Sequence, residues 1–160
     1  MSDTTDPHAA VEGHDGIFVV RAGKNCRDWN GIHYQVGLSG KNVGAKSLSM
    51  NVATIPPGGV AWTHVHRGPG IRCLLAGSVR VEVNGQVHDV EPGGAWFEAG
   101  PDPVLAIASK TVPTAFARVM ILPRELRGKS SIRYVKPEEA DKPRLQTYRV
   151  FVDEFIDLPR

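Results

Sequence analysis

The sequence predicts an all-β protein, and two observations support that fold class. Seventeen glycines and twelve prolines divide the 160 residues into short segments rich in valine, isoleucine, threonine and aromatic residues. Segments of this kind between turn-forming residues are typical of strands. Between residues 17 and 122 almost no stretch has the apolar period of a helix. The length fits one domain with a proper hydrophobic core.

The elements follow in order from the N-terminus. Residues 1–16 are polar and acidic, and we expect them to be disordered because they lack apolar groups that offset the entropy of ordering. They also lack the charged start and apolar stretch of a secretory signal, so we expect a cytoplasmic protein. No apolar run approaches the roughly 20 residues that cross a membrane. Strands are predicted at residues 17–21, 32–36, 47–55, 60–66, 71–75, 78–83, 86–90, 95–98, 104–108 and 114–122.

The clearest local prediction is a hairpin at Asn84-Gly85, which separates two alternating runs. This dipeptide favours a type I′ turn, because both central residues take a positive φ. Counting outward from the turn pairs Val81 with His88. His88 then falls on the more apolar face of the hairpin.

The composition changes after residue 123. Residues 124–160 are densely charged and carry only short apolar patches, so they cannot form a core of their own. We therefore expect the main domain at residues 17–123, with an extension that packs on it or on a partner subunit. Residues 148–152 alternate like a strand. We expect a homodimer in which this segment or an N-terminal strand pairs with the neighbouring subunit's sheet edge, while a solvated extension remains an alternative.

Charge and cysteine content exclude several classes of protein. The net charge of +2, with basic and acidic residues interleaved, gives no basic patch for nucleic acid. Cys26 and Cys73 belong to no CxxC unit, and we expect both to be reduced in a cytosolic chain. Cys73 is expected to be buried and inert.

The stretch GGVAWTHVHRGPGIRCLLAG at residues 58–77 carries the strongest functional signal. Gly58, His64, His66 and Gly77 fall at the spacings of G-x5-H-x-H-x3,4-E-x6-G, the first motif of the cupin superfamily. The second motif, G-x5-P-x-G-x2-H-x3-N, is matched loosely from Gly85 onward. Over roughly residues 30–122 the chain resembles a small single-domain cupin of the RmlC-like type.

The resemblance implies an antiparallel double-stranded β-helix, the jelly-roll barrel, which holds a small ligand and is often dimeric. Many cupins bind iron, manganese, zinc or nickel through three histidines and one glutamate. Members include dioxygenases, decarboxylases, isomerases, lyases, cyclases and non-catalytic domains, so the fold alone does not identify the reaction. This chain departs from the pattern at two ligand positions: Gly70 stands at the glutamate and Pro103 at the third histidine.

A metal site is one interpretation of what remains. Alternation along a strand puts His64 and His66 on the same face, so both imidazoles can reach one divalent ion. Two protein ligands hold such an ion weakly, because catalytic zinc sites normally use three. Glu98 would complete the set of two histidines and one carboxylate found in non-heme iron enzymes. The candidates for a third ligand are Glu98, His88, His33 and Asp102.

A metal-free site is the other interpretation, and both remain open. Arg72 lies two residues beyond Gly70, so alternation directs its side chain inward, although a solvent-facing Arg72 is an alternative. An inward arginine beside His64 and His66 would make a pocket for a carboxylate, phosphate or enolate oxygen. Either histidine could then act as general acid or base. Other residues that flank the motifs could line the substrate pocket or simply pack in the core: Trp62, His88, Trp96 and Glu98.

These residues lead to three functional hypotheses. The first is a small-molecule cupin enzyme of intracellular metabolism, an acid/base isomerase, cyclase, dehydratase or lyase, with His64, His66 and Arg72 as catalytic residues. The second is a dioxygenase or decarboxylase that holds one divalent ion of iron, manganese, zinc or nickel. The third is a binding module without catalysis.

Overall fold

The computed structural model describes residues 10–12, 17–21, 34–38 and 44–158, with side chains described from residue 46 to residue 157. Three short strands pair in order as an antiparallel sheet: β1 (Ala10–Glu12), β2 (Ile17–Arg21) and β3 (Tyr34–Leu38). We expected disorder over residues 1–16. Most of these residues lie outside the described ones, and Ala10–Glu12 forms a strand.

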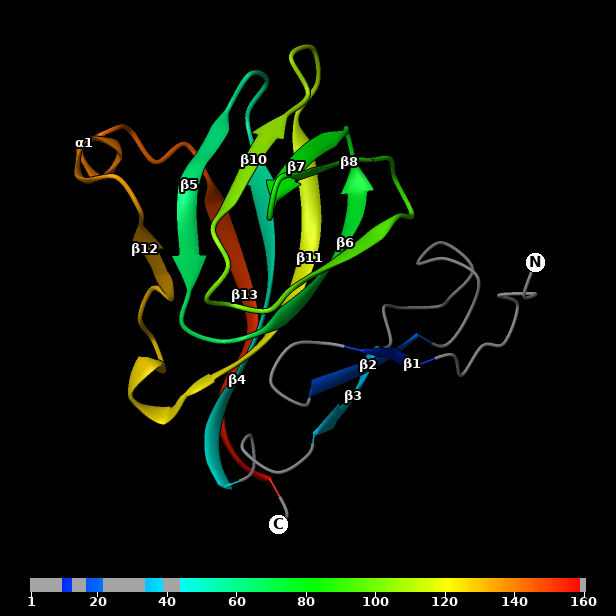
Figure 1. Ribbon diagram of the computed structural model, residues 1–160, viewed down its shortest axis with the longest axis vertical. Coiled ribbons are helices and arrows are strands. Elements are labelled where there is room, and N and C mark those ends of the chain that lie inside the picture. The colour runs from blue at the N-terminus through cyan, green and yellow to red at the C-terminus, as the bar shows by residue number, and fades with distance from the viewer. Residues whose placement is uncertain (1–9, 13–16, 22–33, 39–43, 159–160) are drawn as a thin grey trace.

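Two five-stranded antiparallel sheets face each other and form a barrel (Figure 1). The first has the order β13-β4-β11-β6-β9, with β4 (Gly44–Ile55), β6 (Gly70–Ala76), β9 (Ala95–Glu98), β11 (Thr114–Pro123) and β13 (Thr147–Leu158). The second has the order β12-β5-β10-β7-β8, with β5 (Val60–His66), β7 (Val79–Val83), β8 (Gln86–Val90), β10 (Val104–Ala108) and β12 (Ile132–Tyr134). This architecture confirms the predicted all-β fold.

Short helical turns join the last strands. The 3₁₀ helix η3 (Arg124–Leu126) follows β11, and α1 (Pro137–Ala140) lies between β12 and β13. In the part of the chain that the structure describes, no helix has the length and apolar composition needed to cross a membrane.

The hairpin of β7 and β8 has the predicted turn and register. Asn84 and Gly85 both take positive φ, 51° and 73°, and Val81 pairs with His88. His88 is nevertheless exposed, because β8 is the edge strand of its sheet. On the predicted apolar face of this hairpin, the β7 residues Val79 and Val81 are buried, whereas most of β8 is exposed.

The charged extension packs on its own barrel. β13 pairs antiparallel with β4 along almost its whole length, with one irregularity between Val150 and Val152. β12 pairs with β5 and sets Tyr134 opposite His64. Two segments of the extension, β12 and β13, thus form the outer strands of the two sheets.

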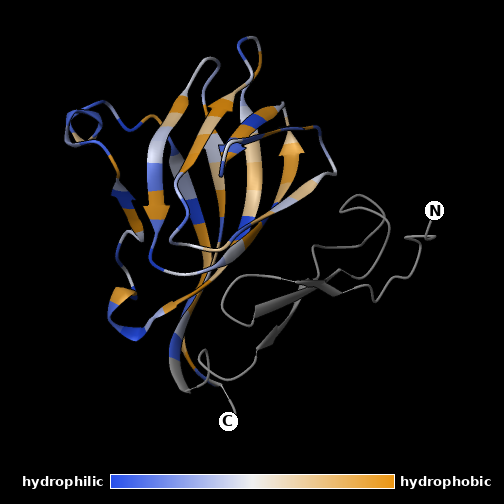
Figure 2. Ribbon diagram, in the orientation of Figure 1, coloured by the Kyte–Doolittle hydropathy of each residue, from blue (hydrophilic) through white to orange (hydrophobic). Residues whose placement is uncertain are grey.

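The barrel interior has a polar layer between two apolar clusters. One cluster contains Ala61, Leu74, Val79, Val81, Val90, Val104 and Ala106, and the other contains Met120, Leu122 and Leu126. Along β11, Phe116 packs on the first cluster, Met120 belongs to the second, and Arg118 lies between them. Figure 2 shows that hydrophilic and hydrophobic residues alternate along the barrel strands. Such a buried polar layer is costly unless its members are paired or serve a ligand.

Cys73 corrects one of our expectations. It is fully buried on β6, as predicted, but it is disulfide-bonded rather than reduced. Cys26, the other cysteine of the sequence, lies outside the described residues. Sequence spacing could not reveal a disulfide, because the bond depends on which segments meet in space.

Candidate functional site

His64 and His66 reach the barrel interior because β5 contains a bulge. Val104 of β10 pairs with His64 and Ala106 pairs with Ala61, so β5 carries one extra residue between these pairs. A bulge of this kind re-aims the side chains on one side of it. Ala61 and both histidines are therefore buried, at 6%, 5% and 5% exposure, although strict alternation would separate Ala61 from the histidines.

Hydrogen bonds fix both imidazole rings through Nδ1. His64 Nδ1 lies 2.7 Å from the backbone oxygen of Trp62, which can only accept, so Nδ1 carries the proton. His66 Nδ1 lies 2.8 Å from Ser131 Oγ, whose hydroxyl donates to Met120 Sδ at 3.8 Å and whose oxygen can then accept from the ring. The Nε2 atom of each neutral ring therefore presents a lone pair. This is the tautomer that metal-binding histidines use.

Burial keeps the two rings neutral. Loss of hydration lowers the pKa of His64, partly opposed by the negative charge of Glu98. Loss of hydration lowers the pKa of His66 much further, and the positive charge of Arg72 adds to this effect. The rings meet edge to face with centroids 4.9 Å apart. Both are thus available as ligands or bases at neutral pH.

Glu98 supplies the carboxylate that Gly70 cannot. Gly70 on β6, at the position of the motif's glutamate, is the direct cross-strand partner of Glu98 on β9. The Glu98 carboxylate therefore lies on the neighbouring strand, next to the position where the motif has its glutamate. A Cβ on Gly70 would lie 2.7 Å from Met120 Cγ and 3.1 Å from Arg72 Nη1. The space that a glutamate would need at residue 70 is therefore already filled.

Arg72 points inward as the alternation predicted, and its guanidinium contacts Gly70 and Glu98. It is 1% exposed, donates from Nη1 to the Gly70 oxygen at 2.7 Å, and lies 2.7 Å from Glu98 Oε2 through Nη2. That second contact is a close ion pair in which neither atom has a well-directed hydrogen bond. Burial lowers the pKa of Arg72 to about 10, so it stays charged at neutral pH. Arg72 therefore orients Glu98 rather than facing an open pocket.

Glu98 Oε2 and the two histidines converge on one point. Ligand atoms of His64, His66 and Glu98 all lie within 4.8 Å of one another, and His66 Nε2 is 3.4 Å from Glu98 Oε2. Two ring lone pairs and a carboxylate oxygen repel one another unless a cation or proton lies between them. Glu98 Oε2 accepts no well-directed hydrogen bond, whereas Oε1 accepts one from Trp96 Nε1 at 2.9 Å. This donor set fits a divalent metal ion.

The other predicted residues lie outside this group. The Trp62 ring packs under the Lys142 ammonium, 3.5 Å away, and does not line the cavity described below. His88 is exposed on β8, and Asp102 accepts a hydrogen bond from Asn84 at 3.1 Å. Pro103 lines a shallow depression beside the β7–β8 hairpin. His33 lies outside the described residues.

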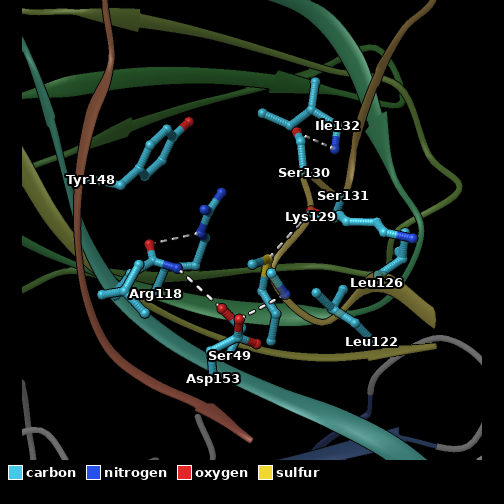
Figure 3. A pocket seen from close by; sticks show the side chains of 14 residues that line it. Ser49, Arg118, Leu122, Leu126, Lys129, Ser130, Ser131, Ile132, Tyr148 and Asp153 are labelled. Atoms are coloured by element: carbon cyan, nitrogen blue, oxygen red, sulfur yellow. Dashed lines mark hydrogen bonds between the residues drawn. The ribbon is translucent and has the colours of Figure 1, made fainter. Parts of the chain in front are cut away.

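A cavity of about 280 Å³ adjoins the three-residue group. Ser131 connects the two, since it lines the cavity and contacts His66. Figure 3 shows Arg118 and Tyr148 reaching into this cavity, with Ser130 and Ile132 across from them. Sequence patterns did not single out Arg118 or Tyr148. The sequence feature that could have identified Arg118 is its position as the one charged residue in the apolar strand TAFARVMIL, on the face that is buried.

Comparisons with known proteins agree with the fold. The family model described as "Cupin domain" matches residues 51–100, and comparison with curated proteins found no match. The solved DMSP lyase DddQ from Ruegeria pomeroyi DSS-3 has 22% identity and a TM-score of 0.50, over 57% of this chain and 45% of that one. The polyketide cyclase RemF from Streptomyces resistomycificus has 18% identity and a TM-score of 0.47, over 85% and 84%.

A further solved structure, an RmlC-like cupin from Shewanella frigidimarina NCIMB 400, has 12% identity and a TM-score of 0.44, over 77% of this chain and 91% of that one. The match to the DMSP lyase spans less than half of that protein's length. At these identities the likeness concerns the fold. The His-x-His spacing, the two-sheet barrel and the family match over residues 51–100 together support a small cupin-superfamily domain.

Proposed function

We propose that this chain is a small-molecule cupin enzyme that binds one divalent metal ion through His64, His66 and Glu98. Its reaction would be a proton transfer of lyase or isomerase type on a small organic acid. The observation that carries the proposal is the convergence of one ligand atom each from His64, His66 and Glu98 within 4.8 Å, with His66 Nε2 3.4 Å from Glu98 Oε2. This donor set favours the metal-bound alternative over the metal-free one.

The surrounding residues hold this group in place. The Trp62 oxygen and the Ser131 hydroxyl fix the two rings, and Trp96 with Arg72 fixes the two oxygens of Glu98. A divalent ion held there would act as a Lewis acid and stabilise negative charge on a substrate oxygen. Preorganised ligands of this kind lower the cost of reorganisation during the reaction.

Tyr148 lines the cavity. Burial raises the pKa of its phenol, although the nearby Arg118 charge opposes this effect. The phenol is therefore protonated at neutral pH. Its hydroxyl donates to the Gln146 side-chain oxygen at 3.0 Å, and its oxygen can accept a hydrogen bond from a substrate. We assign it a role in binding and orienting the substrate.

The proposal can be tested before the substrate is known, by measuring whether the protein exchanges carbon-bound protons of small carboxylic acids for deuterium. Chelator-treated protein is reconstituted separately with Mn²⁺, Fe²⁺, Co²⁺, Ni²⁺ and Zn²⁺ and incubated in D2O with a panel of small carboxylic acids. Proton NMR should reveal deuterium at the carbon next to the carboxylate of one acid, only with metal present. His66→Ala should abolish the exchange, and the exposed His88→Ala should retain it. Exchange that is equal in chelated protein would contradict the metal assignment.

The set of two histidines and one carboxylate also supports a second candidate, a non-heme iron oxygenase. Oxygen consumption by the Fe²⁺ form in the presence of a panel acid, with none for the Zn²⁺ form, would favour this candidate over proton transfer.

A further inference from the structure

Arg118 is a buried cation that forms no close ion pair among the described residues. It is 8% exposed, and its Nε donates to the side-chain oxygen of Asn51 at 3.2 Å. Its guanidinium carbon lies 5.0 Å from the centre of the Tyr148 ring. Within the described residues, no ion pair joins Arg118 to a carboxylate. An uncompensated buried charge is very costly, so a site of this kind is best explained by an anionic ligand.

The comparison with Arg72 sharpens this point. The two arginines are direct cross-strand partners on β11 and β6, and both side chains are buried in the barrel. Arg72 has Glu98 as its anion and Gly70 as its acceptor. Because Glu98 is engaged by Arg72, Arg118 is left without a comparable partner. Burial lowers the pKa of Arg118, and both Tyr148 and the charge of Glu98, which is not in direct contact, oppose this effect.

The cavity gives a ligand access to this charge. Arg118 lines the space of about 280 Å³ together with uncharged polar side chains of Ser49, Asn51 and Tyr148. In Figure 3 the Arg118 side chain extends toward the open middle of the cavity, while Asp153 lies at the other end beside Ser49. Asp153 is already engaged, since its Oδ2 accepts from the Gly128 N–H at 2.7 Å. Its charge disfavours a second anionic group at that end.

The position of Arg118 also relates it to the proposed metal ligands. Met120, two residues further along β11, pairs with Gly70, which itself pairs with Glu98. Ser131 lines the cavity and contacts His66. None of the three proposed metal ligands lines the cavity itself, so Ser131 is the residue that connects a ligand anchored at Arg118 with His66.

We propose that Arg118 binds the carboxylate of a small organic monoacid in this cavity. The planar guanidinium matches a carboxylate in two parallel hydrogen bonds. The volume lies just below the usual range for ligand pockets, so the acid is small. The fate of the bound acid rests on the proposed function, but its binding does not require the metal.

Binding to chelator-treated protein tests this proposal apart from the metal chemistry. Propanoate is titrated into the ¹⁵N-labelled protein, and the amide signals of Ser131 and Ile132 are followed by NMR. Propanamide, which has the same shape without the charge, is the matched ligand control. We expect saturable shifts with propanoate and binding at least about tenfold weaker with propanamide, because charge-assisted hydrogen bonds are lost.

The variants locate the site. Arg118→Gln should weaken propanoate binding about tenfold or more, and Arg118→Lys should retain part of it through the remaining charge. Arg133→Gln removes an exposed arginine of β12 and should leave binding unchanged. Equal binding of propanoate and propanamide, which needs no variant, would overturn the proposal, as would full propanoate affinity in Arg118→Gln. If propanoate binds but no panel acid exchanges protons, the proposed reaction fails and the Arg118 site stands.

Discussion

The Glu98 carboxylate contacts both Arg72 and His66, and we expect the stability of the folded protein to depend on it. Among the described residues, its Oε2 is the one carboxylate oxygen that pairs with Arg72, and the same atom faces His66. Removing one member of a buried ion pair leaves an uncompensated charge and typically costs about 3–5 kcal/mol. An exposed pair contributes about 1 kcal/mol or less.

This difference gives a matched pair of substitutions. Glu98→Gln should lower the free energy of unfolding by about 3–5 kcal/mol, because Arg72 stays buried. Glu125→Gln makes the same chemical change in the exposed Arg67–Glu125 pair and should cost about 1 kcal/mol or less. Urea unfolding of chelated protein measures both. Equal losses in the two variants would show that Arg72 finds another partner.

The two histidines predict a pH dependence. Burial lowers the pKa of both in the folded protein, so below the ordinary pKa of about 6.5 the unfolded chain binds more protons than the folded one. The free energy of unfolding of chelated protein should therefore fall as the pH drops from about 7 to about 5.5. His66→Asn should flatten this fall, and the exposed His88→Asn should not. A fall of the same size in all three proteins would contradict this origin.

Part of the site could be predicted residue by residue. Strand alternation placed His64 and His66 together and directed Arg72 inward. The choice of Glu98 among four candidates needed the cross-strand register of Gly70, which no local pattern reveals. Arg118 was missed because the apparent anion-binding residue was Arg72. Only the three-dimensional pairing of Arg72 with Glu98 shows which arginine is left for a ligand.

At the scale of elements, turns and bulges position the strands. The type I′ turn at Asn84-Gly85 was predictable, because it depends on two adjacent residues. The bulge in β5 was not, because it appears only when β5 pairs with β10. In this register the half-buried Trp62 lies under Lys142, away from the site.

Gly77 and Gly85 have the same left-handed backbone conformation but differ in the space available for a side chain. Replacing each by alanine therefore distinguishes the cost of the backbone conformation from the cost of a steric clash. Gly85 and Gly77 have φ of 73° and 75°, but a Cβ would meet nothing within 4 Å at Gly85 and would lie 2.6 Å from the Pro113 oxygen at Gly77. Gly85→Ala should cost about 1–2 kcal/mol from the left-handed conformation alone. Gly77→Ala should cost clearly more, because the backbone must also shift. Thermal unfolding of both variants measures the difference, and equal costs would contradict it.

At the scale of the whole molecule, the all-β class followed from composition and spacing, whereas the pairing of the extension did not. β13 is the outermost strand of its sheet, and Val150 and Phe151 on it are 58% and 53% exposed. An unpaired edge with apolar side chains is a template for association. The homodimer that we expected from the sequence stays a prediction.

Light scattering tests that prediction. The wild-type protein should have about twice the mass of the 17.4 kDa chain, and Phe151→Asp on β13 should give the monomer. Val112→Asp, at an exposed apolar residue outside the barrel strands, is the matched control and should remain dimeric. A wild-type monomer at micromolar concentration would exclude the dimer.

The convergence of His64, His66 and Glu98 is the central claim, and a cobalt titration tests it most directly. Co²⁺ is added to chelator-treated protein, and the visible absorption of the bound ion is followed to saturation. We predict one equivalent bound by the wild type, with the absorption lost in His66→Ala and strongly reduced in Glu98→Gln, because each removes a ligand. No saturable absorption in the wild type, or an unchanged titration in both variants, would contradict the metal site.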